Sequence, residues 1–188
     1  MNLPNKLTVL RVILVPFFVA FLLLEEIPGN YLLALILFAA ASITDALDGN
    51  IARKRGLVTT FGKFLDPLAD KVLVLSALIC FIALDVASPV VVIIVVAREF
   101  LVTSLRLVAA ADGTVIAASI YGKVKTVVQM VSIVVILLMF AIGELFPVEL
   151  EDATLLAGNI LMWITAAVTV VSGIDYLVKN RHCINTMK

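Results

Sequence analysis

The sequence predicts an all-α integral membrane protein with six transmembrane helices and both chain termini in the cytoplasm. Of its 188 residues, 63% are apolar and only 15% are charged, and the mean hydropathy is +1.17. A soluble domain is typically roughly 45–50% apolar and about 25% charged. Two further observations complete the prediction. Long apolar windows recur along the chain, and lysine and arginine keep to alternate connections between them.

The first three predicted helices occupy windows of about 20 residues, the length that crosses a bilayer. Window 5–24 has no small-residue cleavage site after its apolar stretch, so we expect a retained span and not a signal peptide. Window 31–52 follows the helix breaker Pro28. Window 67–85 opens with Pro67, a pattern typical of a helix start because proline is tolerated at the first helical position.

The last three predicted helices are separated by further helix breakers. Window 88–110 opens at Pro89, and window 120–142 ends before Pro147. Window 154–178 completes the set. These windows leave no room for a separate soluble domain, so we expect a single membrane domain that spans residues 1–188.

The charges are separated along the chain, although their formal sum is zero. Lysine and arginine occur near the N-terminus, around the connections after the second and fourth windows, and near the C-terminus. In the other three connections all charged residues are acidic: Glu25, Glu26, Asp85, Glu144, Glu149, Glu151 and Asp152. Because basic connections stay on the cytoplasmic side, both termini are predicted to be cytoplasmic. The balanced charge argues against a nucleic-acid partner.

Four aspartates lie where the second and third predicted helices meet the cytoplasmic interface. Asp45 and Asp48 are three residues apart, and Asp66 and Asp70 are four apart, so each pair shares one helix face. Burying such a group of ionised carboxylates is costly unless protons or cations compensate it. Carboxylate oxygens suit Mg²⁺ or Mn²⁺. The alternative is that the four face water and pair with nearby basic residues.

Small residues beside the aspartates favour a site for phosphate. Gly49 and Ala52 follow Asp48 on the same predicted helix, where they let a phosphate group approach the backbone. A side chain at Gly62, four residues before Asp66, would be placed to block a metal cluster.

The region 45–70 resembles the signature of the CDP-alcohol phosphotransferase family at all eight of its fixed positions. These positions read Asp45-x2-Asp48-Gly49-x2-Ala52-Arg53-x8-Gly62-x3-Asp66-x3-Asp70. The resemblance implies a membrane-embedded enzyme, often a homodimer, that depends on two divalent cations, Mg²⁺ or Mn²⁺. Such enzymes cleave the pyrophosphate of a CDP-linked donor, transfer a substituted phosphoryl group to an alcohol and release CMP.

The resemblance also implies roles for individual residues. Asp45 and Asp66 would bridge both metals, Asp48 would complete the first metal site, and Asp70 would complete the second. Asp70 would also be the catalytic general base, although the residues alone do not distinguish it from Asp66. The residues expected to hold or line the donor site are Asn5, Thr8, Gly49, Ala52, Arg53, Thr59 and Gly62.

Residues 3–18, 97–110 and 122–130 resemble one branch of this family. The donor of that branch is CDP-diacylglycerol and its acceptor is sn-glycerol 3-phosphate. The resemblance implies a multi-pass protein of the bacterial cytoplasmic (inner) membrane, in contact with membrane lipids and with its active site facing the cytoplasm.

A phosphate-bearing acceptor needs basic residues near the metals. Arg98 and Arg106 lie on roughly one face of the fourth predicted helix, and Lys123 and Lys125 open the fifth. We expect these four side chains to converge as a glycerol-phosphate pocket. The alternative for Arg98 is an ion pair with Glu99 or another helix, and for the other three it is anchoring at the interface.

Two alternative functions follow from the same residues. One is a family member with another acceptor: serine, inositol phosphate or phosphatidylglycerol. The other is a carboxylate-based cation or proton-coupled transporter. Transport favours sites near the membrane midplane and broken helices in both halves of the chain, whereas these aspartates cluster near one interface.

Overall fold

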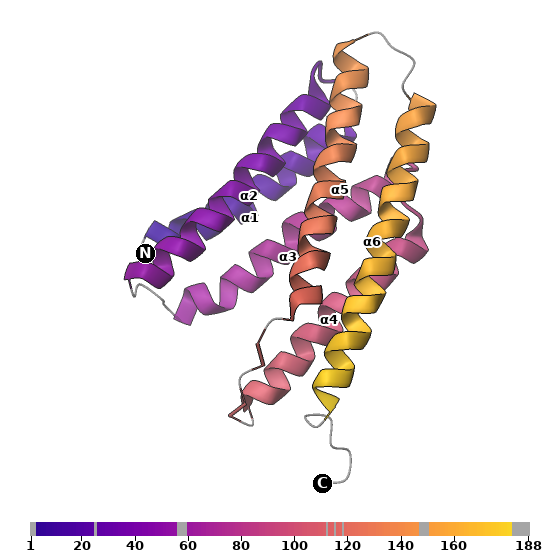
Figure 1. Cartoon of the computed structure of the whole chain (residues 1–188). Coiled ribbons are helices and arrows are strands. Elements are labelled where there is room, and N and C mark those ends of the chain that lie inside the picture. Colours follow the sequence, from indigo (N-terminus) through magenta and orange to yellow (C-terminus); the bar gives the residue numbers. More distant parts are fainter. Residues whose placement is uncertain are drawn as a thin grey trace.

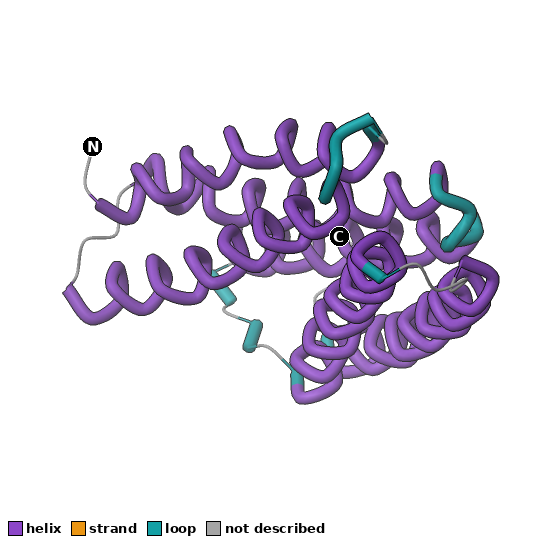
Figure 2. Tube along the Cα trace, turned by 90° about the horizontal axis from the view of Figure 1, so that it is seen from above, coloured by secondary structure: helices purple, strands orange, loops and turns teal. Residues whose placement is uncertain are grey.

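The computed structural model describes the backbone of residues 3–24, 26–55, 60–111, 113–114, 116–117, 119–146 and 151–181. Within these ranges, the side chains of residues 3–4, 45–55, 60–64, 66–67 and 70 lie outside the description. All regular structure in the described part is helical (Figure 2). The helices are α1 (Leu3–Leu23), α2 (Asn30–Arg55), α3 (Thr60–Ala83), α4 (Pro89–Ala111), α5 (Ile120–Leu145) and α6 (Glu151–Lys179).

The predicted all-α class and the six predicted helices are confirmed, with one wrong helix start. The third helix begins at Thr60, so Pro67 lies inside α3 and does not open it. An apolar window detects the lipid-compatible part of a helix and misses its polar first turns. Proline removes one intrahelical hydrogen bond, and α3 continues on both sides of that position.

Three helices of the described part are long and apolar enough to cross a membrane: residues Asn5–Leu23, Ile120–Leu145 and Glu151–Lys179. Helix α4 carries Arg98, Glu99 and Arg106 within its length. Many large apolar side chains face outward, including Ile93 and Leu156, each 66% exposed. Water would make such a surface an aggregation site, whereas hydrocarbon suits it.

The helices alternate in direction, so the starts of α1, α3 and α5 lie toward the same end of the molecule as the ends of α2, α4 and α6 (Figure 1). Helix α1 contacts α2 and α3, α5 contacts α2 and α6, and α6 contacts α4. Phe18 of α1 and Phe38 of α2 are fully buried, with ring centroids 5.6 Å apart. This contact joins the C-terminal part of α1 to the N-terminal half of α2.

The connections after α1 and after α3 contact α5 and α6, respectively. Glu144 of α5 accepts hydrogen bonds from the backbone N–H groups of Gly29 and Tyr31, at the start of α2. A carboxylate at a helix N-terminus satisfies free N–H groups and complements the helix dipole. On α6, a Cβ at Gly158 would lie 2.5 Å from Cγ1 of Val86, so the α3–α4 connection is pressed against that helix.

Candidate active site

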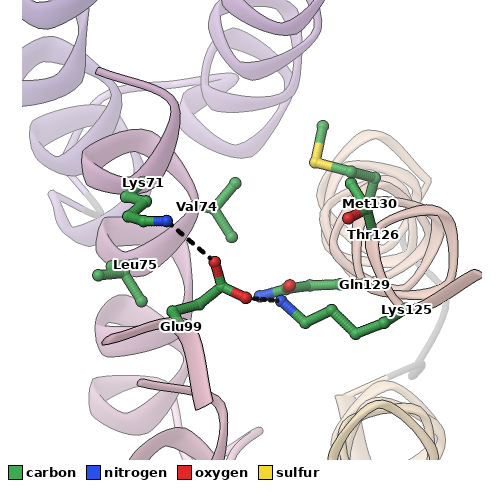
Figure 3. A pocket seen from close by; sticks show the side chains of 8 residues that line it. All are labelled: Lys71, Val74, Leu75, Glu99, Lys125, Thr126, Gln129 and Met130. Carbon is green, nitrogen blue, oxygen red and sulfur yellow. Dashed lines mark hydrogen bonds and ion pairs between the residues drawn. The ribbon is translucent and has the colours of Figure 1, made fainter. Parts of the chain in front are cut away.

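Three cationic side chains from three helices meet at the carboxylate of Glu99 on α4, and Figure 3 shows two of them, Lys71 and Lys125. Oε1 of Glu99 accepts hydrogen bonds from Nη1 of Arg98 at 2.8 Å and from Nζ of Lys125 at 2.6 Å. Its Oε2 accepts one from Nζ of Lys71 at 3.3 Å. We call Lys71, Arg98, Glu99 and Lys125 the Glu99 cluster. Three cations share one carboxylate among the side chains that the structure describes, so the cluster carries surplus positive charge.

A cavity of about 50 Å³ opens beside the Glu99 cluster. Its lining includes Lys71, Glu99, Lys125 and Gln129, from α3, α4 and α5 (Figure 3). Gln129 is only 3% exposed, and its Nε2 has no acceptor among the described residues. A buried donor without a partner is costly. The cavity therefore offers ammonium and amide donors to an anionic or hydroxyl-bearing ligand.

Arg98 is enclosed by α5 and α6 as well as by its own helix. Its Nη2 donates to the hydroxyl of Ser172 at 2.7 Å. A Cβ at Gly173 would lie 3.3 Å from Cγ of Arg98, and one at Gly122 would lie 3.6 Å from Nη2. Small residues on both neighbouring helices therefore leave room for the arginine. The predicted alternative of an Arg98–Glu99 ion pair is confirmed.

Arg106 has a different partner, because its Nε donates to the hydroxyl of Tyr176 at 2.9 Å. Tyr176 lies on α6 and is almost fully buried, whereas Arg106 is exposed. Lys123 is exposed in the first turn of α5. Of the four predicted acceptor residues, the structure thus brings Arg98 and Lys125 into one cluster and gives Arg106 a separate anchor.

The predicted aspartates lie on continuous helices. The backbone of α2 carries Asp45, Asp48, Gly49, Ala52 and Arg53, and that of α3 carries Gly62, Asp66 and Asp70. Helical spacing puts each aspartate pair on one face. The side chains at these positions, and Thr59 as a whole, lie outside the described residues.

The start of α1 presents a buried polar face. Asn5 is 6% exposed, and Thr8 and Arg11 are 1% exposed each. These three residues recur at every third position, so they share one side of the helix. Their burial indicates that this side faces the protein interior and not lipid.

Several described polar residues at the site were not among the predicted site residues: Lys71, Gln129, Ser172 and Tyr176. Each lies on a helix with mostly apolar neighbours, and two pairs follow helical spacing, Lys125 with Gln129 and Ser172 with Tyr176. Polar residues four apart inside an apolar helix share a face. That signal could have found them.

The fold and the site together define a helical protein with helices apolar enough to cross a membrane and a cation-rich internal pocket. The sequence matches the family model described as CDP-alcohol phosphatidyltransferase over residues 1–171. The chain belongs to this family.

Relatives along nearly the whole chain carry related names. The chain is 43% identical to the CDP-diacylglycerol–glycerol-3-phosphate 3-phosphatidyltransferase of Bacillus subtilis, over 98% of each chain. It is 36% identical to a protein of the same name from Rickettsia bellii, over 93% of each chain. It is 40% identical to a probable phosphatidylglycerophosphate synthase of Mycobacterium tuberculosis, over 95% of this chain and 81% of the relative.

Proposed function

We propose that this protein transfers the phosphatidyl group of CDP-diacylglycerol to sn-glycerol 3-phosphate, giving phosphatidylglycerophosphate and CMP. The observation that carries the proposal is the 43% identity to the Bacillus subtilis enzyme over 98% of both chains. The cation-rich pocket supports it, because an acceptor that bears a phosphate needs cationic partners.

Asp45, Asp48, Asp66 and Asp70 would hold two divalent cations, Mg²⁺ or Mn²⁺. The donor set fits, since all four are hard carboxylate ligands and each pair lies on one face of a continuous helix. The bound ions supply charge neutralisation at the pyrophosphate. Residues 45–70 are thus the metal motif of a single membrane domain that spans residues 1–188.

Asp70 acts as the general base. It accepts the proton of the acceptor hydroxyl while that oxygen bonds to the phosphorus that carries diacylglycerol, and the bond from this phosphorus to CMP breaks. Positioning and charge neutralisation provide most of the catalysis in phosphoryl transfer. Asp70 precedes Lys71 in α3, so the turn that carries the proposed base also carries one member of the Glu99 cluster.

Arg98, Arg106, Lys123 and Lys125 bind the phosphate of the acceptor. Arg98 and Lys125 meet on one carboxylate oxygen, and Arg106 is oriented by Tyr176. Asn5, Thr8, Gly49, Ala52, Arg53, Thr59 and Gly62 hold or line the donor site. The burial of Asn5 and Thr8 supports an inward-facing role.

All six helices cross the bacterial cytoplasmic membrane, with both termini and the active site on the cytoplasmic side. The alternating helix directions and the distribution of basic residues support this topology. The lipid donor then enters from the bilayer and the soluble acceptor from the cytoplasm. Resemblance to the family supports a homodimer.

The test is an acceptor panel. Purified protein with CDP-diacylglycerol and Mg²⁺ is offered glycerol 3-phosphate, serine, inositol phosphate and phosphatidylglycerol while CMP release is measured. We expect release with glycerol 3-phosphate alone. Release with another acceptor reassigns the substrate within the family, and no release with any acceptor contradicts the enzymatic function.

A further inference from the structure

Glu99 is a partly buried carboxylate to which the proposed reaction assigns no task. It lies at the centre of the Glu99 cluster and accepts hydrogen bonds from three cations on three helices. Its side chain is 18% exposed, and that of Lys125 is 3% exposed. Burying charge is costly unless it is paired and hydrogen-bonded, so removing Glu99 would leave three like charges facing one another.

The geometry joins the two halves of the proposed site. Oε1 of Glu99 holds Arg98 and Lys125 together, and both are proposed to bind the acceptor phosphate. Oε2 holds Lys71 of α3, the residue that follows Asp70 in the chain. One carboxylate therefore links the turn that carries the proposed general base to the cations that would hold the acceptor.

We propose that Glu99 is a positioning residue of the acceptor site: it fixes Arg98 and Lys125 beside one another and sets their place relative to the turn of α3 that carries Asp70 and Lys71. This proposal rests on the function proposed above. Glu99 touches neither the phosphate nor the reacting atoms, since its own negative charge repels the anion. It acts through the three cations, whose surplus charge remains for the acceptor.

Glu99→Gln tests this proposal because it removes the charge and keeps the shape. We expect the KM for glycerol 3-phosphate to rise about tenfold or more and kcat to fall, because misplaced binding groups cost rate steeply. The KM for CDP-diacylglycerol stays within about twofold, because mispositioned acceptor cations leave donor binding in place. Glu99→Asp keeps the charge and restores part of the acceptor KM.

The matched control is Asp175→Asn on α6. This substitution also removes an ion pair, the one between Asp175 and Lys179 at 2.7 Å, but Asp175 lies outside the Glu99 cluster. We expect both KM values of this control to match the unaltered protein. A double-mutant cycle of Glu99→Gln with Lys125→Met adds a second readout. If Glu99 acts through Lys125, the effects of the two substitutions on the KM for glycerol 3-phosphate are not additive.

Failure of the positioning role is distinguishable from failure of the proposed function. If the unaltered protein releases no CMP with glycerol 3-phosphate, the proposed function falls. If the unaltered protein is active and Glu99→Gln changes neither KM, changes both equally, or lowers only thermal stability, the positioning role falls. Should Glu99→Gln not fold, Lys71→Met takes its place, because it removes one of the three ion pairs. We expect it to raise the KM for glycerol 3-phosphate and not the KM for CDP-diacylglycerol, and the absence of this rise contradicts the positioning role.

Discussion

Arg98 and Arg106 each donate one hydrogen bond to a neutral hydroxyl on α6, from Ser172 and Tyr176 respectively. A hydroxyl partner orients a guanidinium without neutralising it, whereas a carboxylate such as Glu99, which also pairs with Arg98, offsets its charge. Arginine binds phosphate through a planar set of donors, so its orientation decides whether those donors are useful. The hydroxyls of α6 are therefore part of the proposed acceptor site although they carry no charge.

Tyr176→Phe should raise the KM for glycerol 3-phosphate by roughly tenfold, because a hydrogen bond to a charged group contributes about 1.5–3 kcal/mol. The ring stays, so its packing and its contact with the guanidinium, 5.5 Å from the ring centroid, stay too. Steady-state kinetics with each substrate varied in turn measures the effect. Tyr121→Phe, which removes an exposed hydroxyl, is the control. An equal rise in the KM for CDP-diacylglycerol would count against orientation of Arg106.

Asp70→Asn should lower kcat by about 10²–10⁴-fold, the typical contribution of a general base. The amide keeps the size of the side chain and cannot accept the proton as a carboxylate does. CMP release at saturating substrates and Mg²⁺ measures the loss. Glu144→Gln, a carboxylate change at the start of α2, should keep most of the rate. A variant that retains more than about a tenth of the activity would exclude Asp70 as the base.

The charged residues of the site were easier to predict than their partners. Arg98 and Lys125 stand out because ionisable groups are rare in apolar helices. Ser172, Gly173 and Tyr176 do not, since hydroxyls and small residues are common in such helices. Which hydroxyl binds which arginine depends on how α6 packs against α4, and this packing belongs to the tertiary structure, which local sequence patterns do not predict.

At the level of elements, hydropathy predicted the helices well and their polar ends poorly. The six windows each correspond to one helix, but α3 starts at Thr60 and α2 continues to Arg55. Both differences fall in segments rich in charge or small residues, where hydropathy is low although the backbone is helical. The polar extensions carry three of the eight signature positions, Arg53, Gly62 and Asp66, so part of the region of greatest functional interest was also the hardest to delimit.

Gly158→Ala should destabilise the protein by about 1–3 kcal/mol, the usual cost of overpacking. The new Cβ would lie 2.5 Å from Cγ1 of Val86, so α6 or the α3–α4 connection has to move. A lower midpoint of thermal unfolding in detergent measures the change. Ala167→Val enlarges an exposed position of the same helix and should have little effect. In the Gly158→Ala background, Val86→Ala should recover part of the loss, and failure to do so would contradict this contact.

At the scale of the whole molecule, the separation of charge along the chain predicts which connections can be reached from outside the cell. Acidic connections would face outward, and the basic ones and both termini inward. The alternating helix directions agree with an even number of crossings (Figure 1).

A membrane-impermeant thiol reagent tests this topology in intact cells. Asp152→Cys in a Cys183→Ser background should be labelled without permeabilisation, because Asp152 starts α6 on the proposed outer side and is exposed. The native Cys183 should react only after the membrane is opened. Cys80 is buried and should stay unlabelled in both. Labelling of Cys183 in intact cells would reverse the proposed orientation.

The Glu99 cluster holds three cations around one carboxylate beside a small cavity, so the mutual repulsion of the cations opposes folding there. An anion bound at this place relieves that repulsion, and a ligand that binds only the folded state raises stability by mass action. Glycerol 3-phosphate should thus raise the melting temperature of the resting protein, and do so without any donor present. The same molecule that is consumed in turnover would act, between turnovers, as a stabilising ligand.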